Sequence, residues 1–391
     1  MKNFVYHVPT KVFFGKDTEK QVGEIIKGYG YKNILLVYGG GSVKKSGLYD
    51  TVIKSLSDSG IKYSELAGVE PNPKLSMVRQ GAAICKRDGI ELVLAVGGGS
   101  AIDMAKVTAA AALYDGDPWD FSSKIKTPEK ALPVGTILTH AAAGSEMSSS
   151  AVITNEETKI KRGYNSEFNR PLFSILNPEL TYTLPPYQTA CGIVDIMMHT
   201  LERYMTIGGA AEPTDMIAEA ILKTVINAGK VVMNDPTNYE ARAAIMWASS
   251  LSHNDLTGSG KSFFMVSHQI EHELSGMFDN IAHGAGLAVV FPAWAKYAYK
   301  FDMPVFLRYA GNIWGIEYNF NNPEETILAG IKATEDFFVS LGMPVRLGEL
   351  GVAEDSFEEM AVKCTNFGGR KLDGFIQYDK QEIIDILKLA L

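Results

Sequence analysis

The chain has 391 residues, of which 46% are hydrophobic, and its formal net charge is −8 at pH 7. This length and composition predict a globular protein with two domains or one large domain, and exclude a disordered chain. The negative charge, without a block of Lys or Arg, argues against nucleic acid or an anionic membrane as the main partner and favours small molecules.

The chain is also expected to stay in the cytoplasm. Residues 1–10 contain no apolar signal core, and no uncharged apolar run is long enough to span a membrane. The three cysteines, Cys85, Cys191 and Cys364, are far apart and lack a CxxC spacing. They therefore predict neither a disulfide framework nor a zinc ribbon, which fits a reducing compartment.

Short apolar runs alternate with helical patterns in the first half of the chain. Residues 33–38 read as a buried strand, which the turn Gly39-Gly40-Gly41-Ser42 and a helix at 48–57 follow. The same unit recurs as a strand at 91–96, the turn Gly97-Gly98-Gly99-Ser100 and an alanine-rich helix at about 101–114. This alternation predicts a parallel sheet with helices on both faces.

The pattern changes near residue 186. Residues 176–186 contain three prolines and end the strand-like runs, and beyond them apolar residues keep helical spacing, as in the stripe Ala190, Val194, Met197, Leu201 and Tyr204. The predicted fold class is α/β plus all-α, with an α/β domain at 1–185 and an all-helical domain at 186–391.

The two Gly-Gly-Gly-Ser turns indicate phosphate binding. Glycines after a strand let the backbone approach a phosphate, and the first amides of the next helix donate to it. Ser100 could cap the helix and bind phosphate, with Asp103 in the first turn. Glycine triplets also form purely structural turns, but their repetition after two predicted strands favours the phosphate interpretation.

Four potential metal ligands lie in the second half of the chain. Asp195 and His199 are four residues apart, so on a helix they share one face, and His268 and His283 follow. A lone histidine is more often a packed or hydrogen-bonded core residue, and His140 and His253 are assigned to that class. Asp195, however, lies beside an apolar stripe, where a cation would remove the cost of a buried carboxylate. This set predicts a divalent metal centre.

A rival motif overlaps this cluster. The run from His268 to His272 matches the H-x-x-E-H of inverted zinc peptidases, in which Glu271 would be the base. That hypothesis leaves Asp195, His199 and His283 without a role and gives no use for the glycine turns.

These motifs, in their order along the chain, resemble the iron-containing alcohol dehydrogenase family, and most closely its butanol dehydrogenase branch. The resemblance covers essentially the whole chain. It rests on the strand-GGGS-helix unit, Gly144-Ser145-Glu146, Asp195-x3-His199, His268-x3-His272 and His283-Gly284, and on residues 68–73, 131–139 and 285–292. It implies an N-terminal Rossmann-like dinucleotide-binding domain and a C-terminal helical metal-binding domain, in a dehydroquinate synthase-like fold.

The resemblance also implies roles for individual residues. Asp195, His199, His268 and His283 match the metal ligands, a set that suits Fe²⁺ or Zn²⁺. His272 matches a position near the substrate, where it would relay a proton or contact the substrate; its alternative role is a hydrogen bond that orients His268. Gly97, Gly98, Gly99 and Ser100 match the pyrophosphate turn, and Asp103 the residue that faces the nicotinamide amide. Further matches to cofactor positions are Asn72, Thr139 and Lys161, with Lys159 close to the last; Ala143 stands where a threonine is common.

The implied activity is hydride transfer between NAD(P)H and a short-chain aldehyde or alcohol, of the butanol and butyraldehyde type, at a metal that acts as a Lewis acid. Gly39 ends its strand where NAD-preferring relatives carry an acid, and Ser42, Lys44 and Lys45 follow. The turn Gly39, Gly40, Gly41 and Ser42 is therefore expected to bind the ribose, with NADP(H) preferred and NAD(H) possible. The alternative is that Lys44 and Lys45 are ordinary solvated charges.

The family also implies a homodimer. A metal-dependent lyase on the same fold, similar to dehydroquinate synthase, is the other alternative. It needs many basic residues around the metal, but residues 195–283 offer only five, at scattered positions: Arg203, Lys223, Lys230, Arg242 and Lys261.

Overall fold

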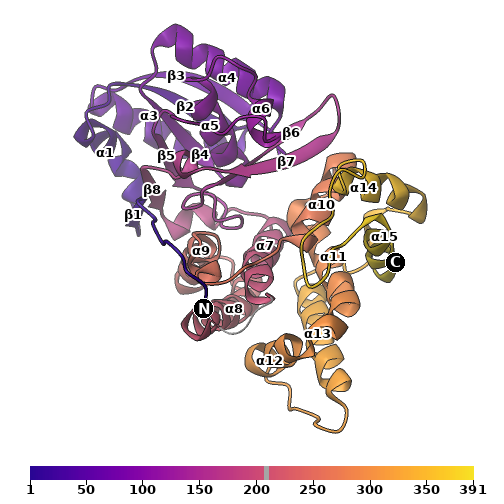
Figure 1. The fold of residues 1–391 in the computed structure, drawn as a ribbon. Coiled ribbons are helices and arrows are strands. Elements are labelled where there is room, and N and C mark those ends of the chain that lie inside the picture. Colours follow the sequence, from indigo (N-terminus) through magenta and orange to yellow (C-terminus); the bar gives the residue numbers. More distant parts are fainter. Residues whose placement is uncertain (207–210) are drawn as a thin grey trace. The chain divides into compact units, whose positions relative to one another are not determined.

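The computed structural model describes residues 1–206 and 211–391, which divide into two compact units (Figure 1). The sheet unit comprises His7–Leu184 and Thr237–Ser250, and the helical unit comprises Met1–Tyr6, Pro185–Pro236 and Leu251–Leu391. None of the helices in the described part of the chain is long and apolar enough to cross a membrane.

The sheet unit contains the predicted parallel sheet. Its six strands follow the order β1-β8-β5-β4-β2-β3, and all neighbouring pairs are parallel. Strands β2 and β4 are buried along almost their whole length, which explains their continuous apolar runs. The strands are β1 (Lys11–Phe14), β2 (Asn33–Gly39), β3 (Lys62–Val69), β4 (Leu92–Gly97), β5 (Val134–Leu138) and β8 (Phe173–Leu176).

Helices connect these strands. The predicted helix at 48–57 is α3 (Leu48–Asp58), and the alanine-rich helix is α5, which begins at Gly99 and ends at Ala111. Apolar side chains of α1 and α3, such as Ile26 and Leu56, pack with those of β2 and β4 in one buried cluster. The remaining helices of this unit's first segment are α1 (Val22–Gly28), α2 (Ser42–Lys45), α4 (Leu75–Asp88) and α6 (Trp119–Ser122).

Two features of the sheet unit were not predicted. An antiparallel hairpin, β6 (Ser150–Asn155) and β7 (Ile160–Asn165), lies between β5 and β8 in the sequence and forms a separate two-stranded sheet. Most of helix α9 (Tyr239–Ser252) also belongs to this unit, although it falls within the predicted domain 186–391. The border at residue 185 between two folding domains stays a prediction.

Specific contacts explain why α9 joins the sheet unit. Trp247 packs edge-on against Phe14 of β1, with ring centroids 6.2 Å apart. Ser250 donates a 2.6 Å hydrogen bond to the buried carboxylate of Glu146. A prediction from local periodicity reads this segment correctly as a helix but cannot show which core it joins.

The helical unit confirms the predicted all-α character of the second half. Apart from isolated bridge residues, Ser262, Leu372 and Tyr378, its described secondary structure is helical. Helix α7 (Pro186–Tyr204) is buried on every side from Thr189 onward, so the predicted apolar stripe is only part of its buried surface. The other helices are α8 (Glu212–Asn234), α10 (Val266–Met277), α11 (His283–Ala298), α12 (Met303–Trp314), α13 (Pro323–Ser340), α14 (Phe357–Cys364) and α15 (Lys380–Leu389).

Candidate active site

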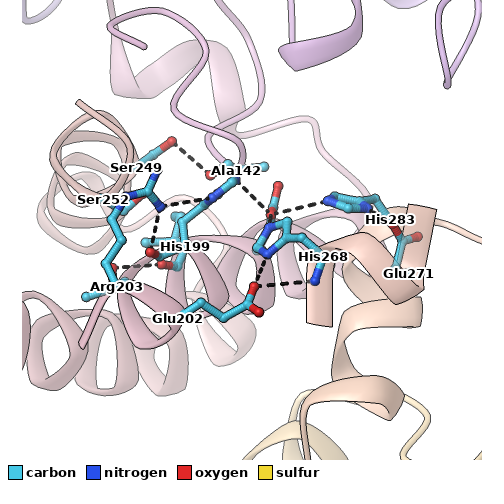
Figure 2. Close-up of polar contacts among 12 residues, drawn as sticks. Ala142, His199, Glu202, Arg203, Ser249, Ser252, His268, Glu271 and His283 are labelled. Carbon is cyan, nitrogen blue, oxygen red and sulfur yellow. Dashed lines mark hydrogen bonds and ion pairs between the residues drawn. The ribbon is translucent and has the colours of Figure 1, made fainter. Parts of the chain in front are cut away.

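Helices α7, α10 and α11 bring the four predicted metal ligands together in the helical unit. Figure 2 shows the three histidines of this set. Asp195 and His199 lie one turn apart on α7, His268 lies in the first turn of α10, and His283 begins α11. The Nε2 atoms of the three histidines lie 3.4, 3.6 and 3.8 Å from Asp195 Oδ1, in the order His199, His268 and His283.

This spacing fits a divalent cation held by three nitrogens and one oxygen. Ligand atoms at roughly 2.1 Å from a tetrahedral ion lie roughly 3.4 Å from one another. Nε2 of His268 is buried, and among the described residues no hydrogen bond reaches it. Because a buried polar atom without a partner is costly, a cation at this point would satisfy it. The donor set suits Fe²⁺ and Zn²⁺ alike.

Two glycines allow the first turn of α11 to pack closely against α7 and α10, which places His283 beside the other predicted ligands. A Cβ atom on Gly284 would lie 2.2 Å from the carbonyl oxygen of Cys191 on α7. A Cβ atom on Gly286 would lie 2.8 Å from Cγ of Glu271 on α10. A side chain at either position would force a neighbour to move, so packing favours glycine at both, most strongly at Gly284, where the neighbour is backbone.

Buried carboxylates orient two of the histidines. Glu202 contacts Nδ1 of His268 and also accepts hydrogen bonds from the backbone amides of Ser267 and His268, at 2.6 and 3.3 Å. Glu271 contacts Nδ1 of His283 in the same way. A carboxylate at Nδ1 fixes the ring and leaves Nε2 directed at the centre. Burial lowers the pKa of His268, but the carboxylates of Glu202 and Asp195 outweigh burial and raise it to about 9.

His199 has a different environment. Nη1 of the buried Arg203 donates a 2.7 Å hydrogen bond to the backbone carbonyl of His199. The same Nη1 lies 3.4 Å from Nδ1 of the His199 ring. Its ring stacks on His253, with centroids 3.9 Å apart. Burial, and then the nearby rings and Arg203, hold the pKa of His199 well below its usual value. The neutral imidazole is the form that can bind a cation.

The structure separates the two histidines of the H-x-x-E-H motif. His268 lies against Asp195, whereas His272 forms a second group with Glu271 and His283. Glu271 is fully buried and is engaged with Nδ1 of His283. This arrangement contradicts the zinc peptidase hypothesis, because its base would have to face the metal-bound water.

The basic residues that the lyase alternative requires do not gather at the centre. Of the five, Arg203 is directed at His199, and Lys261 pairs with Asp215. Lys223 lines a pocket of about 400 Å³ between α8 and α12, Lys230 is exposed on α8, and Arg242 belongs to the sheet unit. The geometry therefore disfavours a carbohydrate-phosphate site around this candidate metal centre.

The second glycine turn follows β4 and begins α5 in the sheet unit. Gly98 precedes the helix in an extended conformation, so that the free amides of the first turn of a 13-residue helix are available. A Cβ atom on Gly98 would lie 3.0 Å from Cβ of His140, and one on Gly99 would lie 3.1 Å from Cβ of Ala143. Both glycines thus permit close packing, and Gly98, Gly99 and Ser100 are partly exposed, so the phosphate role of this turn stays a prediction.

The first glycine turn follows β2, the neighbour of β4 in the sheet. Gly40, Gly41 and Ser42 are exposed, and α2 has only four residues. Lys44 Nζ lies 5.4 Å from the ring centroid of Tyr38 and 4.7 Å from that of Tyr49. Both tyrosine hydroxyls donate 2.6 Å hydrogen bonds to Glu65 on β3. Lys44 thus contacts two aromatic rings beside the turn. Lys44 and Lys45 are both exposed, so the alternative that they are ordinary solvated charges stays open.

The other predicted cofactor residues also lie in the sheet unit. Thr139 donates its amide to the carbonyl of Gly97, so it adjoins the second turn. Asn72 is buried in a left-handed conformation, φ 55°. The next residue, Pro73, accepts a hydrogen bond at its carbonyl from the backbone amide of Thr154. Thr154 lies opposite Lys161 in the antiparallel pair of β6 and β7. The unpredicted hairpin is thus what brings the positions of Asn72 and Lys161 near each other.

The sequence interpretation missed the residues that support these sites. Glu202 and Arg203 follow His199 by three and four residues on α7, a spacing that could have suggested them. Lys106 and Asp103 are the only charged residues of α5, which is also a signal. His253, assigned to the packed class, stacks on a candidate ligand.

Comparison with known proteins identifies the family. The profile of the iron-containing alcohol dehydrogenases matches residues 9–178, and that of the C-terminal region of the Fe-containing alcohol dehydrogenase family matches residues 189–391. The chain therefore belongs to the iron-containing alcohol dehydrogenase family, as the sequence motifs predicted.

The chain is similar over nearly its whole length to individual members of this family. The chain is 45% identical over 389 residues to NADH-dependent butanol dehydrogenase A of Clostridium acetobutylicum, covering 99% of each protein. It is 37% identical over 375 residues to the NADPH-dependent aldehyde reductase YqhD of Escherichia coli, covering 95% of each. The crystal structure of NADH-dependent butanol dehydrogenase A from Thermotoga maritima has a TM-score of 0.96 and 41% identity, and the match covers 100% of this chain and 99% of that one.

Proposed function

We propose that this protein interconverts short-chain aldehydes and alcohols, of the butyraldehyde and butanol type, with NAD(P)H and one divalent metal. The observation that carries the proposal is the convergence of three histidine Nε2 atoms within 3.8 Å of one carboxylate oxygen of Asp195. The names of the relatives from Clostridium acetobutylicum and Thermotoga maritima support the substrate class.

Each part of the chain has a definite task in this reaction. When bound, the cation supplies Lewis acidity toward the substrate oxygen, and the nicotinamide supplies or accepts a hydride. Asp195, His199, His268 and His283 would hold the cation. Glu202 and Glu271 hold two of the imidazoles by Nδ1, so that the ligand nitrogens keep their direction.

His272 is the best candidate for moving the substrate proton. Its ring is partly exposed and lies 5.6 Å, centroid to centroid, from that of His283. The alternative role, orienting His268 through Nδ1, is already filled by Glu202. An imidazole titrates near neutral pH, which suits transfer of a proton to or from an alcohol oxygen.

We also propose that NADPH is accepted and preferred over NADH. Gly39 places no carboxylate at the end of β2, and Lys44 is held beside the turn by Tyr38 and Tyr49. The relatives' names point both ways, because the butanol dehydrogenases are NADH-dependent and the aldehyde reductase YqhD is NADPH-dependent. We base the proposed preference for NADPH on the residues of this chain at the first turn.

The test is aldehyde-dependent oxidation of NADPH and NADH by anaerobically purified enzyme, reconstituted in turn with Fe²⁺ and Zn²⁺. Butyraldehyde turnover that requires metal, with a higher kcat/KM for NADPH than for NADH, is the expected result. A protein that binds one metal per chain but turns over no aldehyde with either cofactor would contradict the proposal. Light scattering of the same sample tests the homodimer that the family implies.

A further inference from the structure

Lys106 is a fully buried lysine on α5, in the middle of the sheet unit. Its Nζ donates hydrogen bonds to the carbonyls of Ser148 and Ser150, at 3.0 and 2.8 Å, and to Oγ of Ser148 at 3.2 Å. All three donors of the ammonium group are therefore used. A buried ammonium is costly, so its contacts must serve more than helix formation.

The segment that accepts hydrogen bonds from Lys106 also donates hydrogen bonds to Asp103. Ser145 Oγ donates to Asp103 Oδ1 at 2.5 Å, and the amide of Val152 donates to Oδ2 at 2.9 Å. Lys106 binds the backbone between these two points and lies one helical turn after Asp103. The lysine and the aspartate thus fix the same loop from the same face of α5.

Other charged and titratable groups surround this pair. The charges of Glu146 and Arg170 both influence Lys106. Glu146 accepts a hydrogen bond from Ser250, and Arg170, which precedes β8, donates one to the carbonyl of Met147. Lys161 and Tyr164 face Asp103 from β7. Burial raises the pKa of Asp103, and the charge of Lys106 is the strongest influence that opposes this rise. Burial lowers the pKa of Lys106 to about 8, although Asp103 and Glu146 act to raise it.

We propose that Lys106 is a positioning residue for the nicotinamide end of the cofactor. Its positive charge favours the ionised form of the half-buried Asp103, and its hydrogen bonds hold the backbone of the segment 148–152 that fixes this carboxylate. Asp103 then presents a charged acceptor of constant orientation to the carboxamide of the cofactor. This inference rests on the proposed function, in which Asp103 faces the nicotinamide, and it assigns a role to a residue that does not itself touch the cofactor.

The test is the pH dependence of the Kd for NADH, measured by fluorescence titration of the metal-loaded protein. NADH is the probe because the 2′-phosphate of NADPH would itself titrate with a pKa of about 6. In the native protein, affinity falls as the pH falls through the pKa of Asp103. In K106M we expect this fall at a pH higher by about one unit or more, because a neighbouring opposite charge lowers a carboxyl pKa by about 1–3 units.

Matched variants separate this role from a general effect on folding. K106R keeps the charge and should keep the native pH profile. K86M is the control, because Lys86 also donates to a carbonyl of this unit, that of Tyr114, but is exposed. D103N should lose the pH dependence, and D103N/K106M should bind NADH within about threefold of D103N, because coupled residues are not additive.

The outcomes are distinct. A K106M profile with the native midpoint overturns the inference even if binding is weaker at every pH. If K106M does not fold, the comparison of D103N with D103N/K106M decides, and a loss beyond about tenfold in the double variant overturns the inference because the variants were expected to be coupled. A native protein that binds neither NADH nor NADPH at any pH contradicts the proposed function instead.

Discussion

Replacing Glu271 by glutamine tests whether a charged partner at Nδ1 of His283 strengthens metal binding. The substitution keeps the shape of the side chain and one acceptor oxygen, so the close contact with Gly286 is preserved. Only the negative charge is lost from the pair with His283, whose ring is buried except for about a quarter of its surface. The effect on the metal can therefore be separated from an effect on packing.

The expected loss can be derived in two ways. A hydrogen bond to a charged group contributes about 1.5–3 kcal/mol, and glutamine would retain part of it. Removal of an outer partner of a metal-bound histidine typically costs about 10–100-fold in metal affinity, which is about 1.4–2.8 kcal/mol. We expect the Kd for Zn²⁺ in E271Q to rise by about tenfold or more, with thermal unfolding of the metal-free protein little changed.

The assay is competition for Zn²⁺ with a chelator of known affinity, followed by metal analysis of the protein. Glu219→Gln is the control, because Glu219 lies in the same unit but accepts from Tyr204 and Asn312. A Zn²⁺ affinity of E271Q equal to that of the control would refute the reasoning. Complete loss of aldehyde reduction with full metal occupancy would instead indicate that Glu271 acts in the chemistry.

Three further predictions follow from the site and its packing. Asp195→Ala should lose metal and activity together while the circular dichroism spectrum is unchanged, and full metal occupancy would contradict the ligand assignment. Gly39→Asp should lower the NADPH/NADH ratio of kcat/KM by about tenfold or more, because the carboxylate would repel the 2′-phosphate. The new Cβ would lie an ordinary 3.4 Å from the carbonyl oxygen of Val69, so the side chain fits without a clash. An unchanged ratio would therefore show that this turn does not contact the ribose. Gly284→Ala should lower the free energy of unfolding in urea by about 3 kcal/mol, because its Cβ would meet backbone atoms of Cys191, whereas Gly28→Ala should change it by less than about 1 kcal/mol.

Local patterns predicted most of the fold and the ligand set. The apolar runs of β2 and β4, the glycine turns and the four-residue spacing of Asp195 and His199 are all visible within short windows of sequence. The family resemblance added His272 as a residue near the substrate, and Asn72, Thr139 and Lys161 as cofactor positions. These predictions depend only on the order of residues along the chain.

The supporting residues could not be predicted in the same way, because their roles depend on distant segments. Along α7, nothing distinguishes Glu202 from other charged residues. Its role becomes visible only from the hydrogen bonds that the amides of Ser267 and His268 on α10 donate to it. Lys106 gains its role only when the segment before β6 folds over α5. The path of the chain into and out of the two cores is likewise a long-range property.

The return of α9 to the sheet unit has a consequence for the chain as a whole. A fragment that stopped at residue 185 would lack Ser250, leaving the carboxylate of Glu146 buried without that donor, and would uncover Phe14 where Trp247 now packs. We therefore expect the sheet unit to reach its native core only when residues 237–250 are supplied with residues 7–184. We expect a chimera that joins this sheet unit to a relative's helical unit to need α9 from the same parent as the sheet.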